Sequence, residues 1–345
     1  MPIKINGHAH LLPYPEQVPQ SIKDQEIFWI ADDRSFMYQK DWSRPITDPS
    51  FFLDKKLEWM ERNGIDHEVI LTLSQLYGNG SSPEEATAIC HFQNNFHAEV
   101  QAEHPKKFTC GFVIPLAYTD LAIREIDRCV NELGLKVLCI PTHYQNKDGQ
   151  WISSADRALA PLYKYADELG LAVEIHPYDG PKFIKLPDMF WRYHLVWMCA
   201  QTADHYHFYT LLDFPRLYPN LRVCYAHGNQ FGQVNVGRRS RAYTGRPDLF
   251  EEAVDPLKNI GAKNIFFDSI VHDVLSFDLL RKRSGTSQII AGLDNPYPLG
   301  EMDCDDCYPG KVIDEAVEHH MITAEQKDQI WYENVVRWLG FDPTR

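Results

Sequence analysis

The strongest constraint on the fold of this 345-residue chain is a regular alternation of short β-branched or aromatic runs with helical patterns. Eight runs are typical of buried strands, and they lie at residues 2–10, 67–73, 107–115, 135–141, 171–177, 221–227, 264–269 and 288–294. Strands that alternate with helices form parallel βαβ units. The pattern therefore predicts an α/β fold, a (β/α)8 TIM barrel, with functional residues on the loops after the carboxyl ends of the strands.

The helical segments between these runs have recognisable ends. The segment "FLDKKLEWMERNG" is expected to stop at Gly64, because glycine commonly ends a helix in the left-handed conformation. A capping box of Ser82 with Glu85 marks the start of another helix. The same device at Thr323 predicts a last helix that continues to Gly340.

Two connections are too long for an ordinary barrel loop. Residues 11–50 are rich in proline, tryptophan, phenylalanine, aspartate and lysine, and they are expected to form a cap inserted between the first strand and the first helix. A second excursion, residues 178–210, is rich in aromatic residues and histidines. Because no linker or repeat divides the chain, residues 1–345 are expected to form a single domain.

Composition excludes several classes of partner. The net charge of −14 and the lack of a lysine- and arginine-rich block argue against nucleic acid, and they require local positive charge if the substrate is a small anion. No apolar run approaches the roughly 20 residues that span a bilayer. The start "MPIKINGH" lacks the basic and then apolar pattern of a signal peptide, so we expect a cytoplasmic enzyme without a membrane partner.

The eight cysteines lie mostly in apolar runs, which is typical of reduced, packed thiols. Cys304 and Cys307 form a lone C-x-x-C pair between acidic residues. A zinc knuckle would need a second pair, so we expect free loop thiols here rather than a metal or redox site.

Five polar side chains end four of the predicted strands. His8 and His10 end the first strand, and because they are two residues apart they face the same side of it. His176, His227 and Asp294 end the fifth, sixth and eighth strands. A single histidine of this kind is more often a hydrogen-bonded core residue, but the set at one rim predicts a metal site. Imidazoles with a carboxylate suit zinc, and iron, manganese or cobalt could occupy similar ligands.

The sequence resembles the metal-dependent amidohydrolase superfamily and, within it, the α-amino-β-carboxymuconate-ε-semialdehyde decarboxylase family. The segments that carry the resemblance are "GHAHLLP", "MYQKDWSRP", "VEIHP", "YAHGN", "FFDS" and "GLDNPYPLGE", and it covers nearly the whole chain. It implies a non-oxidative decarboxylase that converts 2-amino-3-carboxymuconate 6-semialdehyde to 2-aminomuconate 6-semialdehyde with release of CO2, a step in tryptophan degradation. No organic cofactor is implied.

The resemblance also implies a role for each residue at the rim. His8, His10, His176 and Asp294 would bind one divalent metal ion, with Zn2+ as the expected ion. His227 would stay unligated and act as the general acid and base. Together with Asp294, which would serve as both a ligand and a catalytic residue, it would form the reacting centre.

Six further residues would bind the substrate if the resemblance holds. Arg44 corresponds to an arginine that clamps a carboxylate, which fits the planar two-pronged donor that arginine offers. Lys40 is its neighbouring cation, although residues of this type in a polar loop are more often solvated. Trp191 and Tyr297 fall near pocket aromatics and are equally suited to packing. Arg238 or Arg239 would cross a subunit interface, so a homodimer is implied.

Four other residues have interpretations of their own. Asn6 stands where an aspartate is common in the family, which leaves its supporting role open but removes no ligand. Glu174 shares a strand face with His176 and could orient a ligand or belong to a buried network. His205 and His207 have ligand-like spacing but lie in the second excursion, where they do not converge, so we expect them to be structural.

Other activities stay open. The same ligands would serve a decarboxylase of an aromatic hydroxy acid, such as a resorcylate or vanillate derivative. They would also serve a mononuclear hydrolase that acts on an amide, lactone or ring. Binuclear hydrolases of the superfamily bridge two ions with a lysine on the fourth strand, and "LKVLCIP" has none in its interior. A catalytically idle metal-binding barrel is the alternative from a different functional class.

Overall fold

The computed structural model describes residues 2–177 and 189–345. Eight parallel strands form one sheet in the order of the chain, and these are β1 (Ile5–His10), β5 (His67–Leu71), β6 (Phe108–Phe112), β7 (Val137–Pro141), β10 (Ala172–His176), β11 (Arg222–Tyr225), β12 (Ile265–Asp268) and β13 (Ile289–Ile290). The sheet closes on itself, because the Gly7 amide donates to the Ala291 carbonyl over 2.7 Å and the His10 amide to the Asn295 carbonyl over 2.9 Å. The predicted eight-stranded barrel is confirmed.

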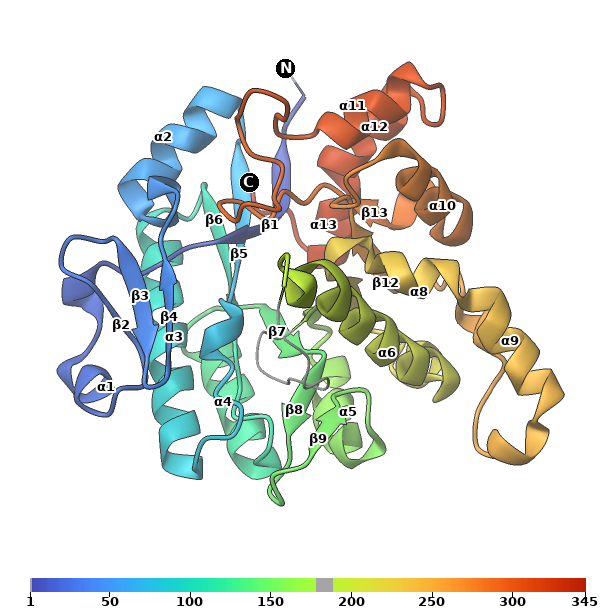
Figure 1. The fold of residues 1–345 in the computed structure, drawn as a ribbon, viewed down its shortest axis with the longest axis horizontal. Helices are drawn as coiled ribbons and strands as arrows, with labels where there is room; N and C mark the ends of the chain where they lie inside the picture. Colours follow the sequence, from blue (N-terminus) through green and yellow to red (C-terminus); the bar gives the residue numbers. More distant parts are fainter. Residues whose placement is uncertain (1, 178–188) are drawn as a thin grey trace.

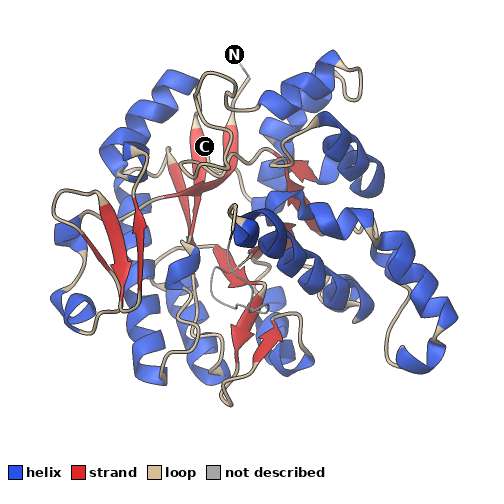
Figure 2. Cartoon of the chain, in the orientation of Figure 1, coloured by secondary structure: helices blue, strands red, loops and turns tan. Residues whose placement is uncertain are grey.

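Helices surround the barrel and close one of its ends (Figures 1 and 2). They are α2 (Leu53–Asn63), α3 (Pro83–Glu103), α4 (Thr119–Asn131), α5 (Ala160–Glu168), α6 (Met198–Leu211), α7 (Phe214–Leu217), α8 (Gln230–Val234), α9 (Val236–Gly245), α10 (Val274–Ser284), α11 (Lys311–Glu318), α12 (Ala324–Trp331) and α13 (Glu333–Leu339). The capping boxes at Ser82 and Thr323 are both formed, and α2 ends at Gly64 with φ +64°. These helix boundaries therefore follow the local capping signals.

The barrel interior is filled by apolar side chains from the strands and is sealed by α13. The strands contribute Ile5, Val69, Leu71, Val137, Cys139, Ala172, Cys224, Phe266 and Ile290 to one buried cluster. Trp338 of α13 joins this cluster and donates its indole N–H to the Arg222 carbonyl over 3.1 Å. The prediction of one continuous last helix is wrong. The chain leaves the helical conformation at Tyr332 (φ −134°, ψ −70°), which separates α12 from α13 and lets α13 close the amino-terminal end of the barrel.

Residues 11–50 contain α1 (Gln20–Asp24) and a three-stranded antiparallel sheet of β2 (Trp29–Ile30), β3 (Phe36–Gln39) and β4 (Trp42–Pro45). Their apolar side chains pack against Ile89 and Phe92 of α3. A hairpin of β8 (His143–Gln145) and β9 (Trp151–Ser153) follows β7, and the sequence did not predict it.

The second long connection is described only in part, because residues 178–188 of the predicted excursion lie outside the described residues. Its described part continues into α6. All eight cysteines are free thiols, including Cys304 and Cys307. Within the described residues, no helix is both long and apolar enough to span a bilayer.

Candidate metal centre

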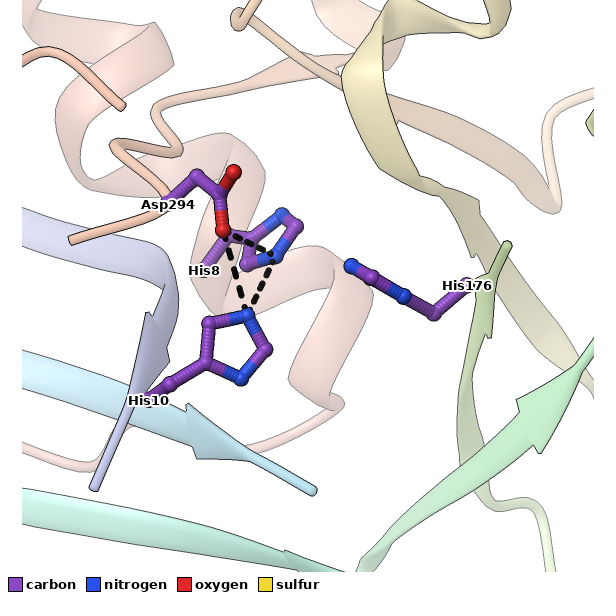
Figure 3. Close-up of side chains that lie close together, drawn as sticks. All are labelled: His8, His10, His176 and Asp294. Carbon is purple, nitrogen blue, oxygen red and sulfur yellow. Dashed lines mark hydrogen bonds and ion pairs between the residues drawn. The ribbon is translucent and has the colours of Figure 1, made fainter. Parts of the chain in front are cut away.

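Four side chains from three strands converge at the carboxyl end of the barrel (Figure 3). His8 and His10 lie on β1, His176 ends β10, and Asp294 follows β13. One potential ligand atom from each residue lies within 4.8 Å of the others, and all four residues are buried. The predicted ligands are thus brought together at one point.

The spacing within this group is that of ligands around a single cation. Nε2 of His8 lies 3.1 Å from Nε2 of His10, and Asp294 Oδ1 lies 3.4 Å and 3.2 Å from these two nitrogens. A tetrahedral zinc ion with bonds of about 2.1 Å holds its ligand atoms about 3.4 Å apart. The donor set therefore fits a metal ion.

His176 offers the fourth donor. Its Nδ1 lies 2.7 Å from the Pro177 carbonyl, so this nitrogen donates and Nε2 remains an acceptor. Nε2 is buried without a hydrogen-bond partner among the described residues, and Figure 3 shows the ring directed at the other three side chains. A buried acceptor without a partner is costly, and a cation at the centre would satisfy it.

The protonation states also suit a metal. Burial lowers the pKa of His10 to about 4 and the pKa of His176 well below its usual value, so both imidazoles are neutral at pH 7. Burial alone would raise the pKa of the Asp294 carboxyl, but hydrogen bonds from His10 and His227 hold that pKa well below its usual value. Neutral imidazole and ionised carboxylate are the forms that bind metals.

Asp268, at the end of β12, supports this group and was missed in the sequence analysis. Its Oδ2 accepts hydrogen bonds from His8 Nδ1 over 2.8 Å and from the His227 amide over 2.9 Å, while Oδ1 accepts from the Gly228 amide over 2.8 Å. The bond to Nδ1 leaves Nε2 of His8 free for the metal. The available signal was the segment "FFDS", which ends the seventh strand with a carboxylate.

His227 lies beside the four donors but is held by a different backbone conformation. It follows β11 with φ +54°, a left-handed geometry that costs about 1–3 kcal/mol for a residue other than glycine. The two backbone hydrogen bonds to Asp268 stabilise this turn. As a result, Nε2 lies 3.5 Å from Asp294 Oδ2, and the side chain is 17% exposed at the rim.

The charge of His227 is set by its carboxylate neighbours. Burial alone would lower the pKa of His227, but the hydrogen bond to Asp294 and the negative charges of Asp294 and Asp268 raise that pKa above its usual value. The imidazole can therefore carry a proton near neutral pH and present it to the cavity.

A cavity of about 280 Å³ opens at the centre and is lined by His10, His176, His227 and Asp294. Arg44 of β4, Trp191 and Tyr297 also line it. The Arg44 guanidinium lies 4.6 Å from the centre of the Tyr297 ring, and this ring lies 4.9 Å from the ring of His10. Residues 11–50 therefore contribute a cation to the cavity that holds the metal-binding side chains.

Three of the predicted substrate-binding residues do not reach this cavity within one chain. Lys40 is exposed and is absent from the lining. Arg238 is exposed on α9. Arg239 is buried against the ring of Tyr206, 5.0 Å from its centre, and donates to Thr210 Oγ1 over 3.3 Å. Lys40 and Arg239 thus lie away from the cavity of their own chain, since the loop lysine is exposed and α9 packs its Arg239 face inward. The role of an arginine across a subunit interface stays a prediction.

The other residues that the sequence singled out, His205, His207 and Glu174, do not line the cavity. His205 of α6 is fully buried, and its Nδ1 lies 3.0 Å from the Tyr225 hydroxyl, as expected for a packed histidine. His207 lies on the same helix and does not line the cavity. Glu174 is buried within the barrel, and both of its carboxyl oxygens lack a hydrogen-bond partner among the described residues. Burial raises the pKa of Glu174 well above its usual value, which favours the neutral acid.

A family model described as amidohydrolase matches residues 5–341. A 2-amino-3-carboxymuconate-6-semialdehyde decarboxylase of Dictyostelium discoideum is 28% identical, with 99% of this chain and 93% of the relative aligned. A γ-resorcylate decarboxylase of Rhizobium radiobacter is 25% identical over 54% of this chain and 56% of its own length.

Among solved structures, a dihydroxybenzoic acid decarboxylase from Polaromonas sp. JS666, with bound manganese and the inhibitor 2-nitroresorcinol, has the same fold. Its TM-score is 0.72 at 16% identity, and the match covers 99% of this chain and 97% of that structure.

Proposed function

The chain belongs to the amidohydrolase family and is a carboxy-lyase of it, and we propose that it removes CO2 from 2-amino-3-carboxymuconate 6-semialdehyde to give 2-aminomuconate 6-semialdehyde. The observation that carries this proposal is an alignment with the Dictyostelium relative, whose name gives this activity. The alignment covers 99% of this chain and 93% of the relative. A cavity lined by both an arginine and the metal-binding side chains supports it, because the substrate is an acid. The proposed reaction belongs to tryptophan degradation.

The proposed cofactor is one divalent metal ion, with Zn2+ preferred, held by His8, His10, His176 and Asp294. Three imidazoles and one carboxylate are typical zinc ligands, and manganese is the second candidate because a similar fold binds it. When bound, the ion supplies positive charge that polarises an oxygen of the substrate or of water.

Two side chains of the cavity would handle the substrate itself. Arg44 would bind a substrate carboxylate through two parallel hydrogen bonds and fix its orientation. His227, whose raised pKa favours the protonated form, would give its proton to the carbon that loses CO2 and would recover a proton from water. Trp191 and Tyr297 would exclude water from the reacting carbon.

We extend the proposal to a homodimer in which Arg238 of one protomer approaches the cavity of its partner. Helix α9 lies at the edge of the molecule next to α8 (Figure 1), and Arg238 is exposed there. The neighbouring apolar residues Phe231, Val234 and Leu249 are also exposed, at 39%, 69% and 65%. Exposed apolar side chains beside an exposed cation are typical of a subunit interface.

A second candidate substrate is an aromatic hydroxy acid. The partial match to γ-resorcylate decarboxylase favours it, as does a cavity walled by Trp191 and Tyr297, on which an aromatic ring could stack. Hydrolysis is less well supported. Strand β7, the fourth strand of the barrel, has no lysine between Val137 and Pro141 to bridge a second ion.

The decisive experiment incubates zinc-loaded and manganese-loaded protein with enzymatically generated semialdehyde and follows both absorbance decay and CO2 release. The same protein is tested with γ-resorcylate and with an aromatic lactone. Rapid CO2 release from the semialdehyde alone would support the proposal, and turnover of γ-resorcylate instead would select the second candidate. Loss of the lactone without CO2 release would overturn the decarboxylase assignment.

A further inference from the structure

Three buried polar side chains lie outside the cavity and have no part in the proposed reaction. Asn6 belongs to β1, Lys56 to α2 and Glu68 to β5, and each is 0% exposed. An ion pair of 3.6 Å joins Lys56 Nζ to Glu68 Oε2, and Glu68 Oε1 accepts a hydrogen bond from Asn6 Nδ2 over 3.0 Å. Buried charge of this kind is expensive to maintain, so its position in the fold needs an explanation.

The cluster lies where β1 changes face. Ile5 packs in the barrel interior, whereas Ala9 packs in the outer layer with Trp59 and Met60 of α2. In a regular strand Ile5 and Ala9 would face the same side, and His8 would face the opposite side from Ile5. The pairing of β1 with β5 is irregular between Asn6 and Ala9, so a bulge there turns His8 and His10 into the barrel.

Asn6 hydrogen-bonds to a backbone group of this bulge and to one of the chain that follows β13. Its Oδ1 accepts from the His8 amide over 3.1 Å and from the Leu293 amide over 3.0 Å. Its Nδ2 donates to Glu68 and, over 2.8 Å, to Asn295 Oδ1. An amide side chain has two donor hydrogens and two acceptor lone pairs, and Asn6 uses all of them. An aspartate could not donate to Glu68 and Asn295.

Lys56 completes the contact with the chain around Asp294. Its Nζ donates to the Asn295 carbonyl over 3.3 Å, and the same carbonyl accepts from the His10 amide over 2.9 Å. Lys56 also balances the negative charge of Glu68. Because residue 6 is an asparagine and carries no charge, the cluster as a whole is neutral. The cluster therefore contacts the residues on both sides of Asp294 and the His8 amide, and it is linked to the His10 amide through the Asn295 carbonyl.

We propose that Asn6, Glu68 and Lys56 form a positioning cluster that fixes the bulge of β1 and so holds His8, His10 and Asp294 at metal-binding distance. The inference rests on the metal centre proposed above. These residues touch neither the cavity nor the donor atoms, and they act through the backbone that carries the ligands. The cluster would then set the metal affinity of the protein.

The experiment compares Asn6→Asp and the double variant Lys56→Met/Glu68→Gln with the unaltered protein. Asn6→Asp keeps the acceptor for His8 and Leu293 but loses both donors and adds charge beside Glu68. The double variant removes the ion pair without leaving a single buried charge. Lys55→Met is the matched control, because Lys55 is the neighbouring lysine of α2 and pairs with Glu58 on the surface.

Zinc affinity is measured by competition with a chromophoric chelator, the ligand geometry by the visible spectrum of the Co2+ form, and the stability of the metal-free protein by thermal unfolding. We expect a loss of zinc affinity of about 10- to 100-fold with a changed Co2+ spectrum in both variants, and no change in Lys55→Met. Unchanged affinity and spectra in both variants would overturn the inference. Failure of the unaltered protein to bind metal would instead refute the proposed function.

Discussion

Asp268 Oδ2 lies 2.8 Å from Nδ1 of His8, so one carboxylate fixes which nitrogen of this histidine faces the metal centre. The same oxygen also accepts the His227 amide. A ligand and the proposed proton donor are therefore oriented by one residue that contacts neither the cavity nor the substrate. The geometry of the centre depends on this support as much as on the donors themselves.

Replacement of Asp268 by asparagine should therefore weaken metal binding. The Asp268 oxygens accept from His8, His227 and Gly228, and an amide nitrogen at either position would face an N–H donor. We expect metal affinity to fall by about 10- to 100-fold, measured by metal analysis after dialysis against a weak chelator. Asp273→Asn, which alters an exposed helix cap, is the control, and normal metal retention in Asp268→Asn would contradict the role assigned to Asp268.

The proton-transfer role of His227 can be separated from metal binding. Asparagine is the best replacement because it tolerates the left-handed conformation of this position better than most residues. We expect His227→Asn to lower kcat by about 10²- to 10⁴-fold with metal content unchanged, because general acid catalysis typically contributes that much. Single-turnover assays on metal-loaded protein would measure this loss. A variant with near-normal kcat would remove His227 from proton transfer.

The two predicted cations of the 11–50 segment should behave differently. Arg44 lines the cavity, so Arg44→Met should raise KM by roughly 10- to 100-fold, the equivalent of a charged hydrogen bond worth about 1.5–3 kcal/mol. Lys40 is exposed and away from the lining, so Lys40→Met should leave KM unchanged. Steady-state kinetics on both variants gives the comparison, and equal effects would mean that the segment moves when substrate binds.

The barrel could be predicted because parallel strands buried on both sides appear as short apolar runs, and their polar carboxyl ends stand out against them. His8, His10, His176 and Asp294 could be found in this way, each at the end of a run. The break at Tyr332 could not, because the sequence from Ala324 to Leu339 favours one helix. Only the open end of the barrel, which α13 must fill, divides that helix into two.

The supporting residues were hidden for a different reason. Lys56 lies between Leu53 and Met60 on the apolar face of α2, and this position was a signal of burial. Its partner Glu68 belongs to strand β5, however, and only the fold brings the two side chains together. The side of α9 on which Arg239 lies was equally unpredictable. Two adjacent arginines point in different directions on a helix, and packing against Tyr206 decides which one is buried.

Buried neutral histidines should make the protein less stable in mild acid, and His97 offers the clearest test because it lies on α3 outside the metal centre. Its Nδ1 donates to the Gly111 carbonyl and its Nε2 accepts from Gln93, both over 2.6 Å. Burial lowers the pKa of His97 to about 4. The unfolded chain takes up a proton at this side chain below about pH 6.5, while the folded chain does not until about pH 4.

Stability must therefore fall as the pH is lowered through this window, since the unfolded state binds more protons. His97 alone would contribute a loss on the order of 3 kcal/mol between pH 7 and pH 4. Urea unfolding of the metal-free protein at several pH values measures the slope, and His97→Gln should reduce it by about one proton per molecule while lowering stability at pH 7. An unchanged slope in His97→Gln would mean that His97 is protonated in the folded state. The Gln93 side chain would then have to accept a hydrogen bond from His97 Nε2 rather than donate one to it, because a protonated Nε2 can only donate.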